Sequence, residues 1–104
     1  TSIGIEMFYN CSSLERVTFG VNSVLMSIAD RAFAYCYSLE GIEIPSGVLS
    51  IGTDAFRDCS SMASVTFGEN SMLVDIGDCA FYNCRSLKSI ELPSGVTSIP
   101  DGNF

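Results

Sequence analysis

Residues 76–99 read IGDCAFYNCRSLKSIELPSGVTSI, and the rest of the chain repeats the pattern of this stretch. Phe81 belongs to a series of phenylalanines whose spacing in the sequence alternates between a longer and a shorter value. Isoleucine, cysteine and leucine positions follow the same spacings. The full series is Phe8, Phe33, Phe56, Phe81 and Phe104. A period of about 20 to 50 residues is typical of a solenoid, in which each coil buries its apolar face by stacking on its neighbours. We therefore predict a single repeat array over residues 1–104, with about four coils and a partial fifth.

The main strand of each coil is predicted at residues 87–93 and their counterparts. Ile90 and Leu92 alternate there with Ser89 and Glu91, so one face is apolar and the other is polar, as a half-buried strand requires. A proline or a glycine then ends the pairing. The counterparts are residues 14–20, 39–45 and 62–68.

A second, shorter ladder of strands and a compact corner complete each predicted coil. The ladder is expected at four apolar pairs, Leu25 with Ile28, Val48 with Ile51, Leu73 with Ile76 and Val96 with Ile99. In the corner at residues 78–84, Ala80, Phe81 and Cys84 are spaced like the inner face of one helical turn. We therefore predict short helical or 3₁₀ corners. Long and short coils alternate because a loop insertion recurs in every second coil, so the complete unit is a pair of coils.

Composition excludes several functions. The formal charge of −7 argues against nucleic acid, because binding to phosphates depends on Lys and Arg. There is no histidine, and no base, nucleophile pair or metal cluster is recognisable, so we predict no catalytic site, cofactor or metal. No apolar stretch approaches the length that a membrane span needs, and no basic leader precedes one, so neither membrane insertion nor a signal peptide is predicted.

The repeat resembles the BspA-like leucine-rich repeat, also called the Treponema pallidum type. The residues that carry the resemblance are Leu-x-x-Ile-x-Leu-Pro, Ser-Gly-Val-Thr-Ser-Ile and Ala-Phe-x-x-Cys-x-Ser-Leu, and residues 76–99 match almost throughout. Met7, Ala29 and Met62 depart from the pattern at single positions. The resemblance implies a right-handed, curved solenoid with a parallel sheet on its concave side. It also implies an extracellular or cell-surface protein that adheres to host or microbial proteins.

Four cysteines recur once per coil and one stands apart. The recurring ones are Cys11, Cys36, Cys59 and Cys84. Their apolar neighbours predict an inward ladder of free thiols, although neighbouring rungs could come close enough for a disulfide. Cys79 occupies a position that is charged in the other coils, so it is predicted to be an exposed thiol.

The polar face of the main strands is the predicted binding surface, with two residues per coil. They are Arg16 and Thr18, Gly41 and Glu43, Ser64 and Thr66, Ser89 and Glu91. Small polar residues on the concave sheet of a solenoid can hold an extended protein partner. A second candidate surface is an edge that carries the four tyrosines, Tyr9, Tyr35, Tyr37 and Tyr82.

The alternative to a protein-binding or adhesive module is a structural spacer or a self-assembling solenoid segment. The sequence starts and stops inside a coil without a recognisable cap, so we expect a fragment of a longer array. Exposed Ile3, Phe8, Ile99 and Phe104 at open ends would then favour end-to-end self-association.

Overall fold

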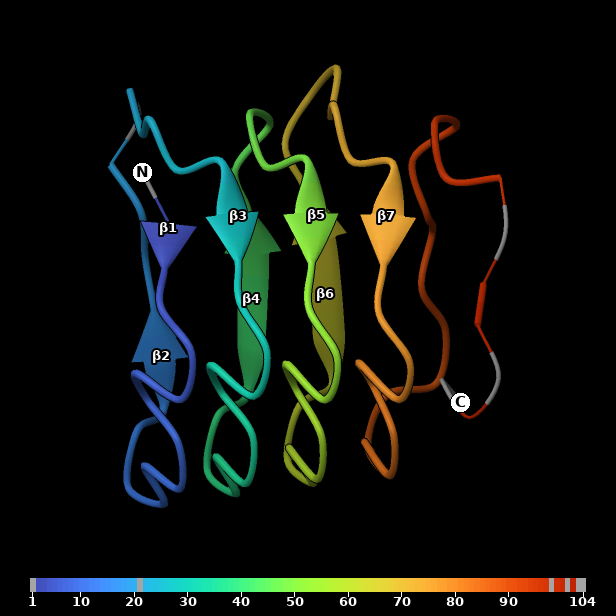
Figure 1. The fold of residues 1–104 in the computed structure, drawn as a ribbon. Coiled ribbons are helices and arrows are strands. Elements are labelled where there is room, and N and C mark those ends of the chain that lie inside the picture. Colours follow the sequence, from blue (N-terminus) through green and yellow to red (C-terminus); the bar gives the residue numbers. More distant parts are fainter. Residues whose placement is uncertain (1, 21, 98, 101, 103–104) are drawn as a thin grey trace.

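The computed structural model describes residues 2–20, 22–97, 99–100 and 102. It is a parallel-strand solenoid with two ladders of short strands, one lying behind the other in the view of Figure 1. One sheet contains, in order, β1 (Ser2–Ile3), β3 (Ser27–Ile28), β5 (Ser50–Ile51) and β7 (Asp75–Ile76). The other contains β2 (Arg16–Val17), β4 (Gly41–Ile44) and β6 (Ser64–Phe67). We call residues 2–26, 27–49, 50–74 and 75–97 coils 1 to 4.

The pairing register repeats the sequence period. In the four-stranded sheet Ser2 pairs with Ser27, Ser27 with Ser50 and Ser50 with Asp75, all in parallel. The steps are long, short and long, in the same order as the steps between the phenylalanines, so the extra residues of the long coils lie outside the ladders. The main ladder is therefore confirmed in coils 1 to 3, where it forms β2, β4 and β6. The second ladder is confirmed at β3, β5 and β7, whereas the predicted fourth pair, Val96 with Ile99, forms no strand among the described residues.

The fourth main strand was predicted at residues 87–93, and no strand forms there. Ile90 and Leu92 are only half-buried, whereas Ile42 and Ile44 of β4 are buried. The difference follows from packing, because β4 is paired on both sides, whereas among the described residues this stretch faces only the coil that contains β6.

The core is a set of ladders in which each coil contributes the same residue type. Phe8, Phe33, Phe56 and Phe81 stack with centroids 5.1 to 5.4 Å apart and with nearly parallel rings. Buried isoleucines, leucines and cysteines surround this column. Ile3 was expected to be exposed and is instead buried, because its side chain points into this core. Phe8 is partly buried, Ile99 is 47% exposed, and Phe104 lies outside the described residues.

The helical or 3₁₀ corners are the part of the fold prediction that is wrong, since the described residues contain no helix. Arg31 and Tyr35, at the two ends of the corner in coil 2, have φ angles of 56° and 62°. Their counterparts in the other coils are Glu6 and Asn10, Asp54 and Asp58, and Cys79 and Asn83, all with positive φ. Left-handed residues interrupt the right-handed run that a helix needs.

The corners instead alternate hydrogen bonds within a coil and between coils. The Ala34 amide donates to the Arg31 carbonyl at 3.2 Å, whereas the Phe33 amide donates to Ala55 of the next coil at 2.8 Å. The Tyr35 amide likewise reaches the Arg57 carbonyl at 2.7 Å. Each corner is therefore a folded turn that extends the ladder of bonds between coils around the edge of the solenoid.

Candidate protein-binding face

The polar face of the three-stranded sheet carries the predicted binding residues in register. Arg16 of β2, Gly41 of β4 and Ser64 of β6 are aligned across the sheet, and Glu43 is aligned with Thr66. Gly41 is half-buried and the other four side chains are exposed. Alternation places them outside because the next residue of each strand, such as Ile42 or Val65, is buried in the core.

Two adjoining hollows bring all eight predicted residues together. A hollow of about 380 Å³ is lined by Arg16, Thr18, Gly41, Glu43, Ser64 and Thr66 among others. A second hollow of about 670 Å³ lies between β6 and residues 89–94, and its lining includes Ser64, Thr66, Ser89 and Glu91. Since Ser64 and Thr66 line both, the surface is continuous from coil 1 to coil 4.

Three of the predicted residues lie outside the strands. Thr18 follows the last residue of β2, and Ser89 and Glu91 belong to the unpaired stretch of coil 4. Glu40 was not predicted for the face, yet it lines the smaller hollow beside Glu43. In the sequence Glu40 directly precedes β4, outside the alternating residues from which the face was predicted. Glu40 adds a carboxylate to the face.

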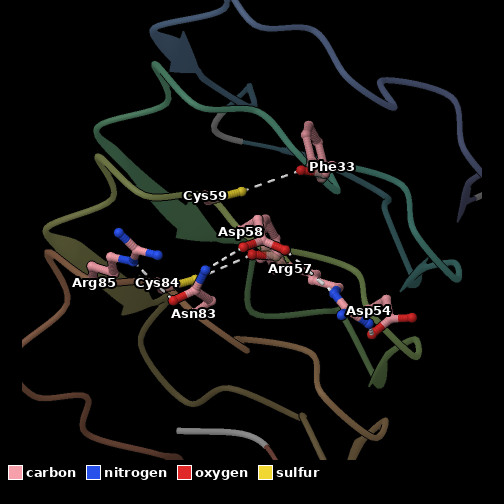
Figure 2. Close-up of polar contacts among 9 residues, drawn as sticks. Phe33, Asp54, Arg57, Asp58, Cys59, Asn83, Cys84 and Arg85 are labelled. Atoms are coloured by element: carbon pink, nitrogen blue, oxygen red, sulfur yellow. Dashed lines mark hydrogen bonds and ion pairs between the residues drawn. The ribbon is translucent and has the colours of Figure 1, made fainter.

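The recurring cysteines form the predicted inward ladder, and their thiols also donate hydrogen bonds. Cys36, Cys59 and Cys84 are buried, whereas Cys11 is half-buried, and all are free. The three buried thiols donate to the carbonyls of Phe8, Phe33 and Phe56 of the preceding coil at 3.1, 3.2 and 3.1 Å. Each of them therefore satisfies a carbonyl as well as filling core volume. Figure 2 shows the bond from Cys59 to Phe33.

Cys59 and Cys84 are poor nucleophiles because their pKa values are raised, whereas the hydrogen bond with Cys59 lowers the pKa of Cys36. Burial raises the pKa of Cys84 to about 11, and the hydrogen bond with Cys36, together with burial, raises the pKa of Cys59. Cys79 was predicted to be exposed and is half-buried. Gly102 lies close to it, since a Cβ added at Gly102 would be only 2.9 Å from the Cys79 sulfur. Cys79 is nevertheless more accessible than the ladder thiols of coils 2 to 4.

We expect the native protein to be alkylated by iodoacetamide first at Cys79 and Cys11. A pKa near 11 lowers the thiolate fraction of Cys84 at pH 8 by about a hundredfold relative to an ordinary thiol of pKa 9.0. Mass spectrometry of peptides after timed labelling measures the order, and urea-unfolded protein, in which all five should react, is the control. Labelling of Cys59 as fast as Cys79 would contradict the buried ladder.

The raised pKa values of Cys59 and Cys84 predict a pH dependence of stability. A folded-state pKa raised above that of the unfolded chain means that the folded protein holds its proton longer. The free energy of unfolding should therefore fall as the pH rises from about 9 to about 11, which urea titrations at several pH values would measure.

The corner edge of coils 3 and 4 holds a polar network (Figure 2). Arg57 lies 3.3 Å from Asp58 and 3.5 Å from Asp54, and its guanidinium lies 4.8 Å from the centroid of the Tyr82 ring. Asp58 also accepts a hydrogen bond from Asn83, which in turn accepts one from Arg85 at 3.0 Å. Of the residues at this edge, the sequence pointed only to the tyrosines. The ion pairs and hydrogen bonds of the network could not be predicted, because they depend on which side chains the stacked coils bring together.

The tyrosines of coils 1 and 2 pack against each other on the same edge. Tyr9 and Tyr35 meet edge to face with centroids 5.4 Å apart, and Tyr37 lies 6.2 Å from Tyr35. The tyrosines of this edge therefore contact one another, although Tyr9 and Tyr37 remain exposed.

No group of three or more His, Cys, Asp or Glu side chains suited to a metal ion occurs among the described residues. The same residues include no helix of the length and apolar character that a membrane crossing needs.

Known proteins share this architecture. A crystal structure of a T. pallidum leucine-rich repeat protein has a TM-score of 0.67 and 29% identity over 78% of the chain, which spans 37% of that protein. A leucine-rich repeat protein from Bacteroides capillosus gives 0.68 and 29% identity, covering 84% of this chain and 65% of the other. A leucine-rich cell-surface protein from Faecalibacterium prausnitzii gives 0.51 and 27% identity, covering 98% and 39% respectively. No curated protein sequence is similar enough to count as a match.

The family profile of the BspA-type leucine-rich repeat region matches residues 1–104 with six copies of its unit. Members of this family are typically protein-interaction modules without catalytic activity. The match spans the chain and agrees with the parallel ladders, the phenylalanine column and the recurring cysteines. The chain belongs to the BspA-type leucine-rich repeat family.

Proposed function

We propose that the chain is a non-catalytic protein-binding module, and that it holds an extended segment of its partner across the polar face of β2, β4 and β6. The observation that carries the proposal is the pair of adjoining hollows, which share Ser64 and Thr66 and together contain all eight polar face residues. Parallel strands about 4.8 Å apart offer rows of small hydroxyls and carboxylates at a regular spacing. A partner in extended conformation can follow such rows without rearranging the sheet.

The charges of the face define the chemistry of the partner. Glu40, Glu43 and Glu91 lie on it, against the single cation Arg16 among the residues that line the two hollows. A face with an excess of carboxylates favours a segment with Lys or Arg among small polar residues. Because these side chains are exposed, each charge pair contributes modestly, and binding should weaken at high salt.

We further propose that the module acts in adhesion on a cell surface or in a secreted protein, with a host or microbial surface protein as its partner. Two solved relatives support this location. One is the F. prausnitzii leucine-rich cell-surface protein. The other is the pneumococcal vaccine antigen PcpA, which has a TM-score of 0.60 and 27% identity over 79% of this chain and 26% of its own length.

Peptides selected from a random phage-displayed library on the immobilised chain test the binding face. We expect them to be rich in Lys or Arg and to lose severalfold, up to about tenfold, in affinity on Glu43→Lys or Glu91→Lys, measured by surface plasmon resonance. Asp78→Lys is the matched control, because it makes the same change of charge at an exposed corner residue outside both hollows.

Two results would count against the proposal. One is selected peptides that bind the Glu43 and Glu91 variants as well as the parent chain. The other is an equal loss with Asp78→Lys, since that would reflect net charge and not the face.

A further inference from the structure

An apolar stripe lies outside the core and outside the proposed binding face. It consists of Val24, Met26, Leu49, Met72 and Val74. Val24 is 71% exposed, Met26 51%, Met72 58% and Val74 49%, whereas Leu49 at the centre is half-buried. None of the five lines either hollow of the binding face.

Backbone bonds between coils place these side chains next to one another. The Leu49 amide donates to the Met26 carbonyl at 2.8 Å, and the Val74 amide donates to the Leu49 carbonyl at 3.0 Å. Met26, Leu49 and Val74 are therefore adjacent rungs of one row. Val24 and Met72 stand two positions earlier in coils 1 and 3, while coil 2 has Gly47 at that position. The segments that lead into β3, β5 and β7 lie side by side along one edge of the solenoid (Figure 1).

The stripe is an unusual surface for a chain of net charge −7. Apart from half-buried Leu49 its side chains are exposed, although acidic Glu69 and Asp75 are close to it in the sequence, and none of the five belongs to the core cluster. Contiguous exposed apolar patches of a few hundred square ångströms mark interaction sites in soluble proteins. Methionine suits such a site, because its flexible side chain adapts to the surface that it meets.

We propose that the stripe docks against the same stripe of a second copy of the chain, side by side and antiparallel. A twofold axis near Leu49 would then place coil 1 of one copy against coil 3 of the other. Val24 faces Met72 of the partner subunit in this arrangement, and Met26 faces Val74 of the partner subunit. Each contact pairs a small side chain with a long one.

Two features of the chain point to a second copy in this orientation. The apolar residues Val24 and Met26 of coil 1 recur as Met72 and Val74 of coil 3, one pair of coils later. A second copy of the chain therefore presents apolar groups at the same spacing. Charge fixes the direction, because acidic Asp75 of coil 4, at the edge of the stripe next to Val74, corresponds to uncharged Ser27 next to Met26. The antiparallel arrangement puts carboxylates opposite serine, whereas a parallel one would oppose identical carboxylates, which is unfavourable.

The size of the stripe predicts a weak, closed dimer. Stable interfaces bury about 1,200 Å² or more in total, and a stripe of five side chains is small by that measure, so the dimer should be weak. A closed dimer also differs from end-to-end stacking, which would add further copies without limit.

Sedimentation velocity in reductant, from low micromolar to near-millimolar protein, measures the association. We expect a concentration-dependent dimer with the parent chain, and at least a tenfold weaker dimer with Met26→Ser. The matched control is Met7→Ser, which removes another exposed methionine, 59% accessible, outside the stripe and should leave the dimer unchanged. A monomer at every concentration, or equal weakening by Met7→Ser, would overturn the proposal.

Disulfide trapping tests the orientation independently, in a Cys79→Ser background. Leu49→Cys lies opposite itself across the proposed axis, so it should form a covalent dimer on mild oxidation. Val24→Cys lies opposite Met72 of the partner subunit and should not. Rapid trapping of Val24→Cys with itself would overturn the antiparallel arrangement. Because the polar face takes no part, the selected peptides should bind the Met26→Ser variant normally, which separates this test from that of the proposed function.

Discussion

Phe56→Ala is expected to lower the free energy of unfolding by about 3–5 kcal/mol. The ring of Phe56 has no exposed surface and lies in the middle of the phenylalanine column. It stacks on Phe33 at 5.3 Å and on Phe81 at 5.4 Å, with interplanar angles of 2° and 3°. Its removal leaves a cavity lined by two coils at once. A solenoid depends on contacts between neighbouring coils, so the loss uncouples both halves of the stack.

Urea denaturation followed by circular dichroism measures this effect. Phe8→Ala is the matched control, since Phe8 is half-buried and stacks on Phe33 alone among the described rings, so its loss should cost clearly less. Phe56→Leu, which retains most of the apolar volume, provides a folded variant if the alanine variant does not fold. Equal effects of the changes at Phe8 and Phe56 would refute a column whose centre carries most of the packing energy.

Gly77→Ala is expected to destabilise the protein by about 1–3 kcal/mol or more, although it adds only one methyl group. A Cβ at this position would lie 2.4 Å from the Thr53 nitrogen and 2.6 Å from the Gly52 carbonyl carbon. These are backbone atoms of the preceding coil, so the clash cannot be relieved by a side-chain rotation. Coils 3 and 4 would have to separate, which would lengthen the bond from the Gly77 amide to the Ile51 carbonyl, now 2.8 Å.

The stabilities of the Gly77→Ala and Gly20→Ala variants are compared by thermal and urea unfolding. No atom lies within 4 Å of a Cβ added at Gly20, so that change should be neutral or stabilising by up to about 1 kcal/mol. Equal stability of the two variants would contradict the close approach of the coils. Ala29 occupies the equivalent position in coil 2. It faces coil 1, where its amide donates to the Ile3 carbonyl at 2.9 Å, so a methyl group is accommodated at that interface.

The stacking of the coils could be predicted from the sequence, whereas the path of the corners could not. The alternating long and short period specifies which residues meet between coils, and the observed register follows that period at every rung. In the corners, Phe81 and Cys84 have the spacing of one helical turn. A turn with left-handed residues at Cys79 and Asn83 directs the same side chains inward, so spacing alone cannot distinguish the two.

The candidate face shows the same division. Strand alternation alone places residues such as Glu43 and Thr66 on the outer face, because the side-chain period of a strand is two. The two hollows, the carboxylate that Glu40 adds and the bonds from Cys59 and Cys84 to carbonyls arise only where coils stack. By itself, the sequence determined the repeat, the core ladders and the outward faces, because these depend on local periodicity. Only the tertiary structure decided the corner conformation, the unpaired stretch of coil 4 and the apolar stripe, because these depend on which atoms neighbouring coils bring together.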